Sequence, residues 1–131
     1  MVELTASDLA LLTGPNYATF VTMNPDGSPH ATITWVDAAD GQVLVNTAEG
    51  RIKHRNCVAN PNVAITVMKD GDAYDWISIT GTVVAFETGE AVPLAGEALQ
   101  LLALPERVRT RALREVLEEG VHLGGRGRHL R

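Results

Sequence analysis

The chain has 131 residues, of which 45% are hydrophobic and 21% are charged, and its formal net charge is −5 at pH 7. This length and composition are typical of one globular domain with a single core. The negative charge disfavours binding to nucleic acids, because nonspecific binding needs a broad cationic surface that displaces counterions.

The first predicted element is a short amphipathic helix over residues 7–13, which Ser7 caps and Gly14-Pro15 ends. Period-2 alternation and many β-branched residues then predict five strands, at residues 17–23, 30–36, 42–47, 63–69 and 76–86. Three of the connections between them contain Asp-Gly, where glycine takes a positive φ without a Cβ penalty. We therefore expect the first three strands to be consecutive antiparallel neighbours.

Between the third and fourth strands, "RIKHRNCVAN" has the character of a helix. It ends at Asn60-Pro61, because the residue before a proline resists helical dihedral angles. Short strands with tight turns and one interposed helix predict a mainly β fold, a small antiparallel barrel with peripheral helices.

After about residue 89 the composition changes to that of a helix, with Pro105 dividing it into two pieces. We therefore expect a single domain over residues 1–119 that ends in C-terminal helices. The last twelve residues, 120–131, hold four glycines and little that packs, so a flexible Gly/Arg tail is predicted there.

The stretch "NTAEGRIKHRN", residues 46–56, holds three of the four Lys and Arg residues among the first 89 positions. Cations that open a helix after a strand and a small-residue turn suit a phosphate, because the first N–H groups of a helix carry partial positive charge. Arg51 offers a planar fork, Lys53 a point charge and Thr47 a hydroxyl. The alternative is a solvated helix face. The stretch lacks the spacing of a Walker loop, and the chain has no Rossmann glycine motif in a βαβ unit.

Four segments carry a resemblance to a known family: "ATFVTMNPDGSPHATITWV", "VLVNTAEGRIKHRNCVANPNVAITV", "DAYDW" and "ISITGTVV". Together they resemble the flavin/deazaflavin oxidoreductase superfamily of split β-barrels, which includes pyridoxamine 5′-phosphate oxidase. The likeness covers residues 5–88, and its most specific elements are "RIKHRN…NP" and "DGSPH". Both are closest to the actinobacterial branch, whose members commonly use the deazaflavin coenzyme F-420.

The resemblance implies a split barrel that forms a homodimer, with two cofactor sites at the subunit interface that hold F-420 or, as the alternative, FMN. In such proteins the cofactor's phosphate lies against the basic cluster, and the second strand approaches its ring system. The third strand lines the space between ring and phosphate, and the fifth strand of the partner chain adds residues to the same site. The residues implied are Arg51, Lys53, Arg55 and Asn56 for the phosphate, Thr32, Thr34 and Trp35 for the ring, Asn46 and Thr47 between them, and Trp76 and Ser78 from the partner chain.

Three functions remain open. The first is an F-420-dependent oxidoreductase that transfers a hydride between the cofactor and a small conjugated organic substrate, and the second is an FMN-dependent oxidoreductase. The third is a non-catalytic protein that binds a cofactor, tetrapyrrole or lipid. We name no catalytic residue, because a flavin-type cofactor carries the hydride itself. No metal-ligand spacing is present, and His30 and His54 are expected at the surface.

Relatives usually finish with a closing strand rich in β-branched residues, which the sequence after residue 90 does not suggest. Either a helix replaces that strand or the reading frame differs from that of the relatives. Without the strand the barrel would have an open edge and its activity would be in doubt.

The sequence also bears on the compartment. Neither a signal peptide nor an apolar run of about 20 residues is visible, so we expect a cytoplasmic protein that does not bind membranes. The single cysteine, Cys57, excludes an internal disulfide, and we expect it to be a small buried hydrophobe.

Overall fold

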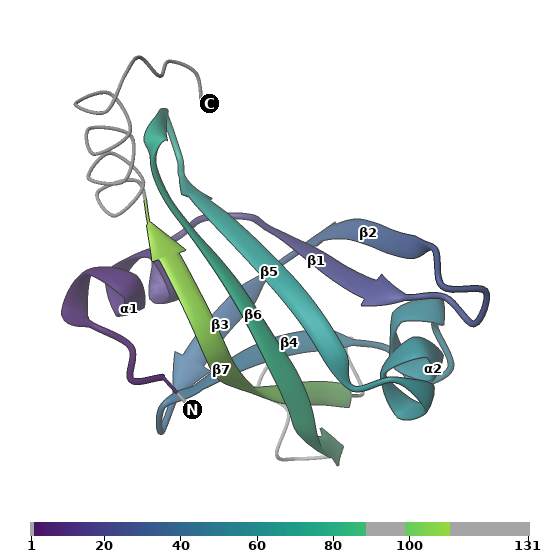
Figure 1. Cartoon of the computed structure of the whole chain (residues 1–131). Helices are drawn as coiled ribbons and strands as arrows, with labels where there is room; N and C mark the ends of the chain where they lie inside the picture. Colours follow the sequence, from purple (N-terminus) through teal and green to yellow (C-terminus); the bar gives the residue numbers. More distant parts are fainter. Residues whose placement is uncertain (1, 89–98, 111–131) are drawn as a thin grey trace, which may run out of the picture.

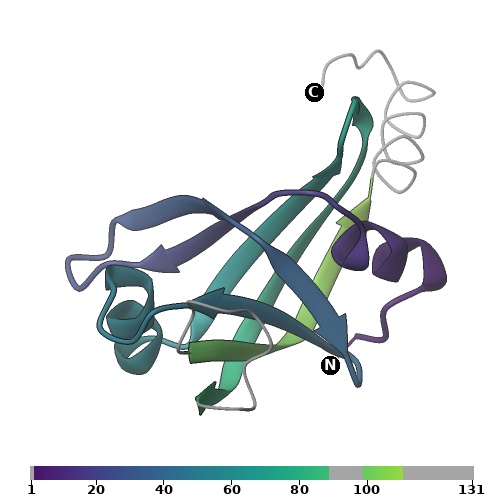
Figure 2. The ribbon, with the colours of Figure 1, turned by 180° about the vertical axis from the view of Figure 1, so that it is seen from behind.

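The structure is a computed structural model that describes residues 2–88 and 99–110. Its seven antiparallel strands form one curled sheet in the order β2-β1-β5-β6-β7-β4-β3, with a helix at either end (Figures 1 and 2). The mainly β, split-barrel fold predicted from the sequence is thereby confirmed. The strands are β1 (Ala18–Met23), β2 (Pro29–Thr34), β3 (Val36–Ala39), β4 (Gln42–Thr47), β5 (Asn62–Lys69), β6 (Asp72–Thr88) and β7 (Leu99–Thr110), and the helices are α1 (Ala6–Thr13) and α2 (Ile52–Ala59).

The two edges of the sheet lie close together, because the sheet is curled and a single residue, Trp35, connects β2 at one edge to β3 at the other. Strands β2 and β3 stand at opposite ends of the strand order, yet this one residue separates them in the sequence. Strand β2 pairs with β1 up to Thr34, and β3 pairs with β4 from Val36 onward. The predicted strand 30–36 is therefore two strands. The first two predicted antiparallel pairings are both present, but they belong to different edges of the sheet.

Helix α1 starts earlier than the sequence suggested. Its N-cap is Thr5 and not Ser7: the Asp8 N–H donates to Thr5 Oγ1 at 3.1 Å, and the Thr5 N–H donates to Asp8 Oδ2 at 2.9 Å. This reciprocal capping box fixes the helix start at Ala6. In the part of the chain that the structure describes, no helix is long and apolar enough to cross a bilayer.

The core fills the inside of the curled sheet. Alternate residues of the strands point inward, and α1 adds two leucines at one end of the sheet. The β3–β4 hairpin turns at Asp40 and Gly41, both with positive φ (54° and 76°), as the Asp-Gly signal predicts. The largest fully buried side chains include Phe20, Leu12, Ile65, Ile77, Ile79 and Leu101.

Residues 99–110 correct the prediction for the end of the domain. They form strand β7, which pairs with β6 on one side and with β4 on the other. The expectation of helices is wrong for this stretch. The inference that the closing strand is missing is wrong as well. With the strand present, there is no longer a reason to suspect a changed reading frame. Leu, Ala, Glu and Arg are good helix formers, but intrinsic helix propensity is a weak preference, and pairing with two neighbouring strands outweighs it. The helix predicted beyond residue 110 and the tail at 120–131 lie outside the described residues.

Candidate functional site

The basic cluster lies where β4 gives way to α2. Strand β4 ends at Thr47, a tight turn follows, and α2 begins at Ile52 with Arg51 as its N-cap. Gly50 in this turn has a φ of 88°, a conformation that glycine adopts without a Cβ clash. The Arg51 side chain makes no capping hydrogen bond to the helix. The first turn of α2 therefore directs its partial positive charge toward the cluster.

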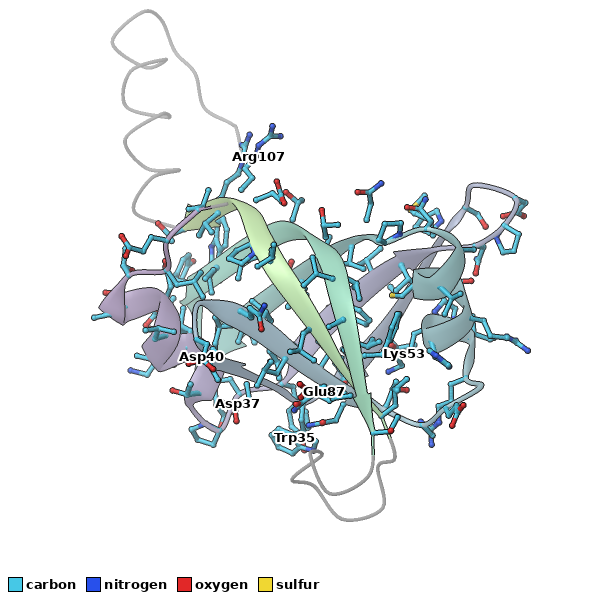
Figure 3. All side chains as sticks on the ribbon, turned by 90° about the horizontal axis from the view of Figure 1, so that it is seen from below. Trp35, Asp37, Asp40, Lys53, Glu87 and Arg107 are labelled. Carbon is cyan, nitrogen blue, oxygen red and sulfur yellow. The ribbon has the colours of Figure 1, made fainter. Side chains whose placement is uncertain are left out.

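Helical periodicity divides the cluster into two sides. Arg51 and Arg55 are both exposed, whereas Lys53 and Asn56 are buried, with exposed fractions of 8% and 4%. Figure 3 shows Lys53 on the side of α2 that lies over the barrel. Lysine is rarely buried this deeply unless its ammonium group is paired. A solvated helix face therefore describes the two arginines, but it does not describe Lys53.

Asn56 fastens α2 to β1. Its Nδ2 donates to Thr22 Oγ1 and to Asn24 Oδ1, each at 3.0 Å, and Thr22 is fully buried. Both hydrogens of the amide nitrogen are thus used within the protein, and the remaining amide oxygen is an acceptor that cannot donate to a phosphate. Figures 1 and 2 both show α2 beside the β1–β2 turn that these bonds reach.

Strands β2 and β4 are not paired with each other near α2. If the register of the β3–β4 ladder continued, Thr34 would stand opposite Thr47. The two strands separate there because β2 leaves to pair with β1. Thr32 and Thr34 share the inward face of β2, and Thr47 is the inward-facing last residue of β4. Three of the predicted site residues therefore face inward from two unpaired strands, and Thr47 directly precedes the turn before α2.

Three buried polar atoms in this region have no hydrogen-bond partner among the described residues: His30 Nδ1, Thr32 Oγ1 and Thr47 Oγ1. A buried polar group without a partner costs about 1–3 kcal/mol. Two of these atoms lie on β2 and one on β4, and all three belong to side chains that face inward. Thr47 is only 1% exposed and directly precedes the basic turn, so its hydroxyl suits a ligand that carries both a phosphate and hydroxyl groups.

Trp35 and Asn46 lie on the other face of the sheet. Strand alternation points them away from the side that Thr34 and Thr47 share. Trp35 is 48% exposed and stacks on Tyr17 with ring centroids 4.2 Å apart, and Figure 3 shows it at the edge of the barrel. Asn46 Oδ1 is buried and accepts from Gln100 Nε2 at 3.2 Å. Neither side chain lies on the inward face with the threonines.

Trp76 and Ser78 lie far from α2 within one chain. The α2 end of β6 is marked by Phe86, whose ring centroid lies 5.4 Å from that of His54. Trp76 precedes Phe86 by ten strand residues, which span about 33 Å. Ser78 Oγ instead lies 3.5 Å from Thr66 Oγ1 on the outer face of the sheet. That these two residues reach the site of a partner chain stays a prediction.

Both histidines expected at the surface are half-buried, which corrects that prediction. The Gly50 N–H donates to His54 Nδ1 at 2.9 Å, so His54 orders the turn before α2. His30 shares the inward face of β2 with Thr32 and Thr34. The alternation of β2 carries the signal for His30, since it places this residue on the same face as the two threonines.

Cys57 is confirmed as a buried hydrophobe. It is 2% exposed, and burial raises the pKa of its thiol from 9.0 to about 11, which keeps it protonated and unreactive near neutral pH. Within residues 2–88 and 99–110, no three His, Cys, Asp or Glu residues gather in a way that could hold a metal ion.

The curled sheet is a split barrel, and a basic helix start follows its strand β4. The chain belongs to the pyridoxamine 5′-phosphate oxidase family, whose model matches residues 4–123. Members of this family share a flavin-binding fold, take flavin- or deazaflavin-type cofactors and are generally oxidoreductases.

Solved structures share the fold at low sequence identity. The chain is similar to an F420 reductase, with 21% identity and a TM-score of 0.65 over 76% of this chain and 94% of that one. A putative pyridoxamine 5′-phosphate oxidase from Listeria innocua has 18% identity and a TM-score of 0.64, with 78% and 93% covered. HupZ from Group A Streptococcus has 14% identity and a TM-score of 0.70, with 82% and 94% covered. These identities show the fold alone, and no curated protein matches the chain.

Proposed function

We propose that this chain is an oxidoreductase that binds a phosphorylated flavin-type cofactor and transfers a hydride between it and a small conjugated organic substrate. The observation that carries the proposal is the junction of β4 and α2, where the buried Lys53 and the unpartnered Thr47 hydroxyl lie at the start of a helix. Coenzyme F-420 is our first choice because of the resemblance in "RIKHRN" and "DGSPH". FMN is the alternative, and membership of the family supports it equally.

The roles proposed for the side chains follow from their positions. Arg51, Lys53 and the first N–H groups of α2 bind the phosphate, and the exposed Arg55 adds a flanking charge. Asn56 holds α2 in place through β1 instead of donating to the phosphate. Thr47 lines the path from the phosphate toward the ring, and the closing strand β7 supports β4 along this path.

The ring of the cofactor would lie against β2. Thr32 and Thr34 on the inward face are the residues proposed to approach it, whereas Trp35 and Asn46 point to the other face of the sheet and are left out of this proposal. The bound cofactor supplies the hydride chemistry. The protein excludes water and holds the ring in a fixed orientation, which by itself accounts for much of the rate of such a transfer.

We also propose that the protein is a cytoplasmic homodimer. The outer face of β1, β2, β5 and β6 supports this, because Ile33 and Met68 are 65% and 47% exposed there and Trp76 lies on the same face. Paired across this face, each chain would offer Trp76 and Ser78 to the site of the other. Light scattering should give twice the 14.0 kDa mass of one chain, and a monomer at all concentrations would contradict the proposal.

Titration of the purified protein with F-420 and with FMN, followed by absorbance and fluorescence, tests the proposed function. Saturable binding of one of them is the expected result, and the bound cofactor, once reduced chemically with dithionite or borohydride, should be reoxidised by an activated alkene or quinone as acceptor. Binding of neither would contradict the proposal. Tight binding without turnover on any acceptor would favour the non-catalytic binding protein.

A further inference from the structure

A cavity of about 440 Å³ lies between α1, the start of β6 and the end of β7. Figures 1 and 2 both show α1 beside this end of β7. The volume lies within the range of small-molecule sites, which is about 300–1,000 Å³. The cavity is remote from the phosphate junction, because α2 lies at the other end of β6, where His54 contacts Phe86.

The charged residues that line this cavity are all acidic in the part of the chain that the structure describes. Glu3, Asp8 and Asp75 line it, and no Lys, Arg or His is among its described lining residues. A cleft lined by charges of one sign raises the local concentration of ions of the opposite sign. The cavity therefore favours a cation.

Asp8 is the most deeply buried of the three acidic residues, with 4% of its surface exposed. Its Oδ2 accepts the N–H of Thr5 at 2.9 Å, and the first turn of α1 also favours its negative charge. No described residue donates a hydrogen bond to its other oxygen, Oδ1. Aspartate is rarely buried this deeply without a paired charge. Oδ1 can therefore accept a hydrogen bond from a cation in the cavity.

Glu3 belongs to a segment that the fold holds on both sides. The Val2 N–H donates to the carbonyl oxygen of Pro105 in β7 at 2.8 Å, and Leu4 is buried in the core. The backbone of Glu3 is thus ordered before any ligand binds, which lowers the entropy cost of binding.

The cavity also has an aromatic wall and apolar walls. Trp76, Leu11 and Val108 line it together with the acidic residues. An indole ring is the best aromatic partner for an organic cation. Among residues 2–88 and 99–110, no three His, Cys, Asp or Glu side chains gather in a way that could hold a metal ion. These walls therefore suit an organic ammonium ion with an apolar body better than a metal ion.

We propose that this cavity binds a small organic cation, an alkyl- or arylammonium ion. Its charged group lies among the three carboxylates, and its apolar body packs against Trp76, Leu11 and Val108. The inference does not rest on the proposed function, because the cavity lies within one chain and takes its ligand without a cofactor. Trp76 also belongs to the proposed dimer face, so the test leaves this residue unchanged.

The test compares phenethylamine with 2-phenylethanol, which has nearly the same size but carries no charge at neutral pH. Titration of the full-length protein, followed by nitrogen-15 NMR, should shift the indole N–H signal of Trp76, which Trp35→Phe distinguishes from the other indole signal. The wild-type protein should bind the amine at least about tenfold more tightly than the alcohol. Glu3→Gln and Asp75→Asn should each reduce that preference about two- to fivefold, and the double variant should lose most of it.

The matched control is Glu87→Gln, which neutralises an exposed carboxylate at the α2 end of β6 and should leave the preference unchanged. Because Glu3 and Asp75 are exposed, their amide variants should keep the stability of the wild type. Asp8 is not varied, because it also caps α1.

The inference is overturned if the amine does not bind, if it binds no better than the alcohol, or if the double variant keeps the wild-type preference. Binding of the amine by a protein that takes up neither F-420 nor FMN would support this inference and contradict the proposed function.

Discussion

Among the cations of the junction, Lys53 is 8% exposed, whereas Arg51 and Arg55 lie in solvent. Exposed ion pairs are worth little, and buried hydrogen-bonded charges are worth more. We therefore expect Lys53→Ala to weaken FMN or F-420 by about 1–3 kcal/mol, and Arg51→Ala to weaken them by less. Riboflavin, which lacks the phosphate, should be affected much less. Fluorescence titration of the variants with FMN and riboflavin measures the difference.

The matched control for this prediction is Lys69→Ala, which removes an exposed lysine at the far end of β5. This control should bind as the wild-type protein does. If Lys53→Ala and Arg51→Ala both keep the wild-type affinity for FMN and F-420, the cluster is a solvated helix face and the phosphate lies elsewhere.

Cys57 predicts an alkaline limit to stability. Burial raises the pKa of its thiol from the 9.0 of an exposed thiol to about 11. Between these two pH values the thiol is therefore mostly ionised in the unfolded state but still protonated in the folded state. This contribution is fully present below pH 9 and is lost as the pH rises from 9 to 11. Between these limits the free energy of unfolding should fall by on the order of 2 kcal/mol more in the wild type than in Cys57→Ala. Denaturant unfolding at several pH values measures this, and parallel curves would refute it.

The bonds of Asn56 predict a coupling between α2 and β1. Asn56→Leu should lower the free energy of unfolding by about 1–3 kcal/mol, because it leaves the buried Thr22 hydroxyl without its donor. Thr22→Val removes the same bond from the other side, so the double variant should lose less than the sum of the two single variants. Asn62→Leu, at an exposed asparagine, is the control and should change stability by less than about 0.5 kcal/mol. Additive losses would show that the two side chains do not interact.

At the scale of the elements, the β6–β7 pairing depends on Gly81. A Cβ built on this residue collides with the carbonyl oxygen of Leu104, next to Pro105, where the register of the two strands shifts. Gly81→Ala should therefore force the backbones apart and cost about 1–3 kcal/mol in thermal or denaturant unfolding. Thr80→Ala, at an exposed neighbour, should cost much less. A Gly81→Ala variant as stable as the wild type would contradict the close approach of the two strands.

The elements differ in how far the sequence alone could predict them. Strands with clear alternation and Asp-Gly turns, such as β4, were predicted with their bounds, because both signals are local. Strand β7 was missed because its leucines, alanine and arginines favour helix and Pro105 suggested a helix break. What makes it a strand is the pair of edges that β4 and β6 offer, and sequence pattern does not reveal such distant neighbours.

At the scale of the whole molecule, the residues of the site also differ in whether the sequence alone could predict them. The junction of Thr47, Arg51 and Lys53 is contiguous in the sequence, so composition and spacing predicted it. The inward direction of His30 depends on the β1–β2 register, which the sequence does not give. The outward direction of Trp35 likewise depends on the crossing that splits the predicted strand into β2 and β3.

The central claim is that one phosphate binds at the end of β4 and the start of α2. A crystal structure of the protein with FMN or F-420 bound tests it most directly. We expect phosphoryl oxygens within hydrogen-bond distance of Lys53 and the first N–H groups of α2, with the rest of the cofactor extending toward β2. A phosphate bound on any other element of the barrel would contradict it.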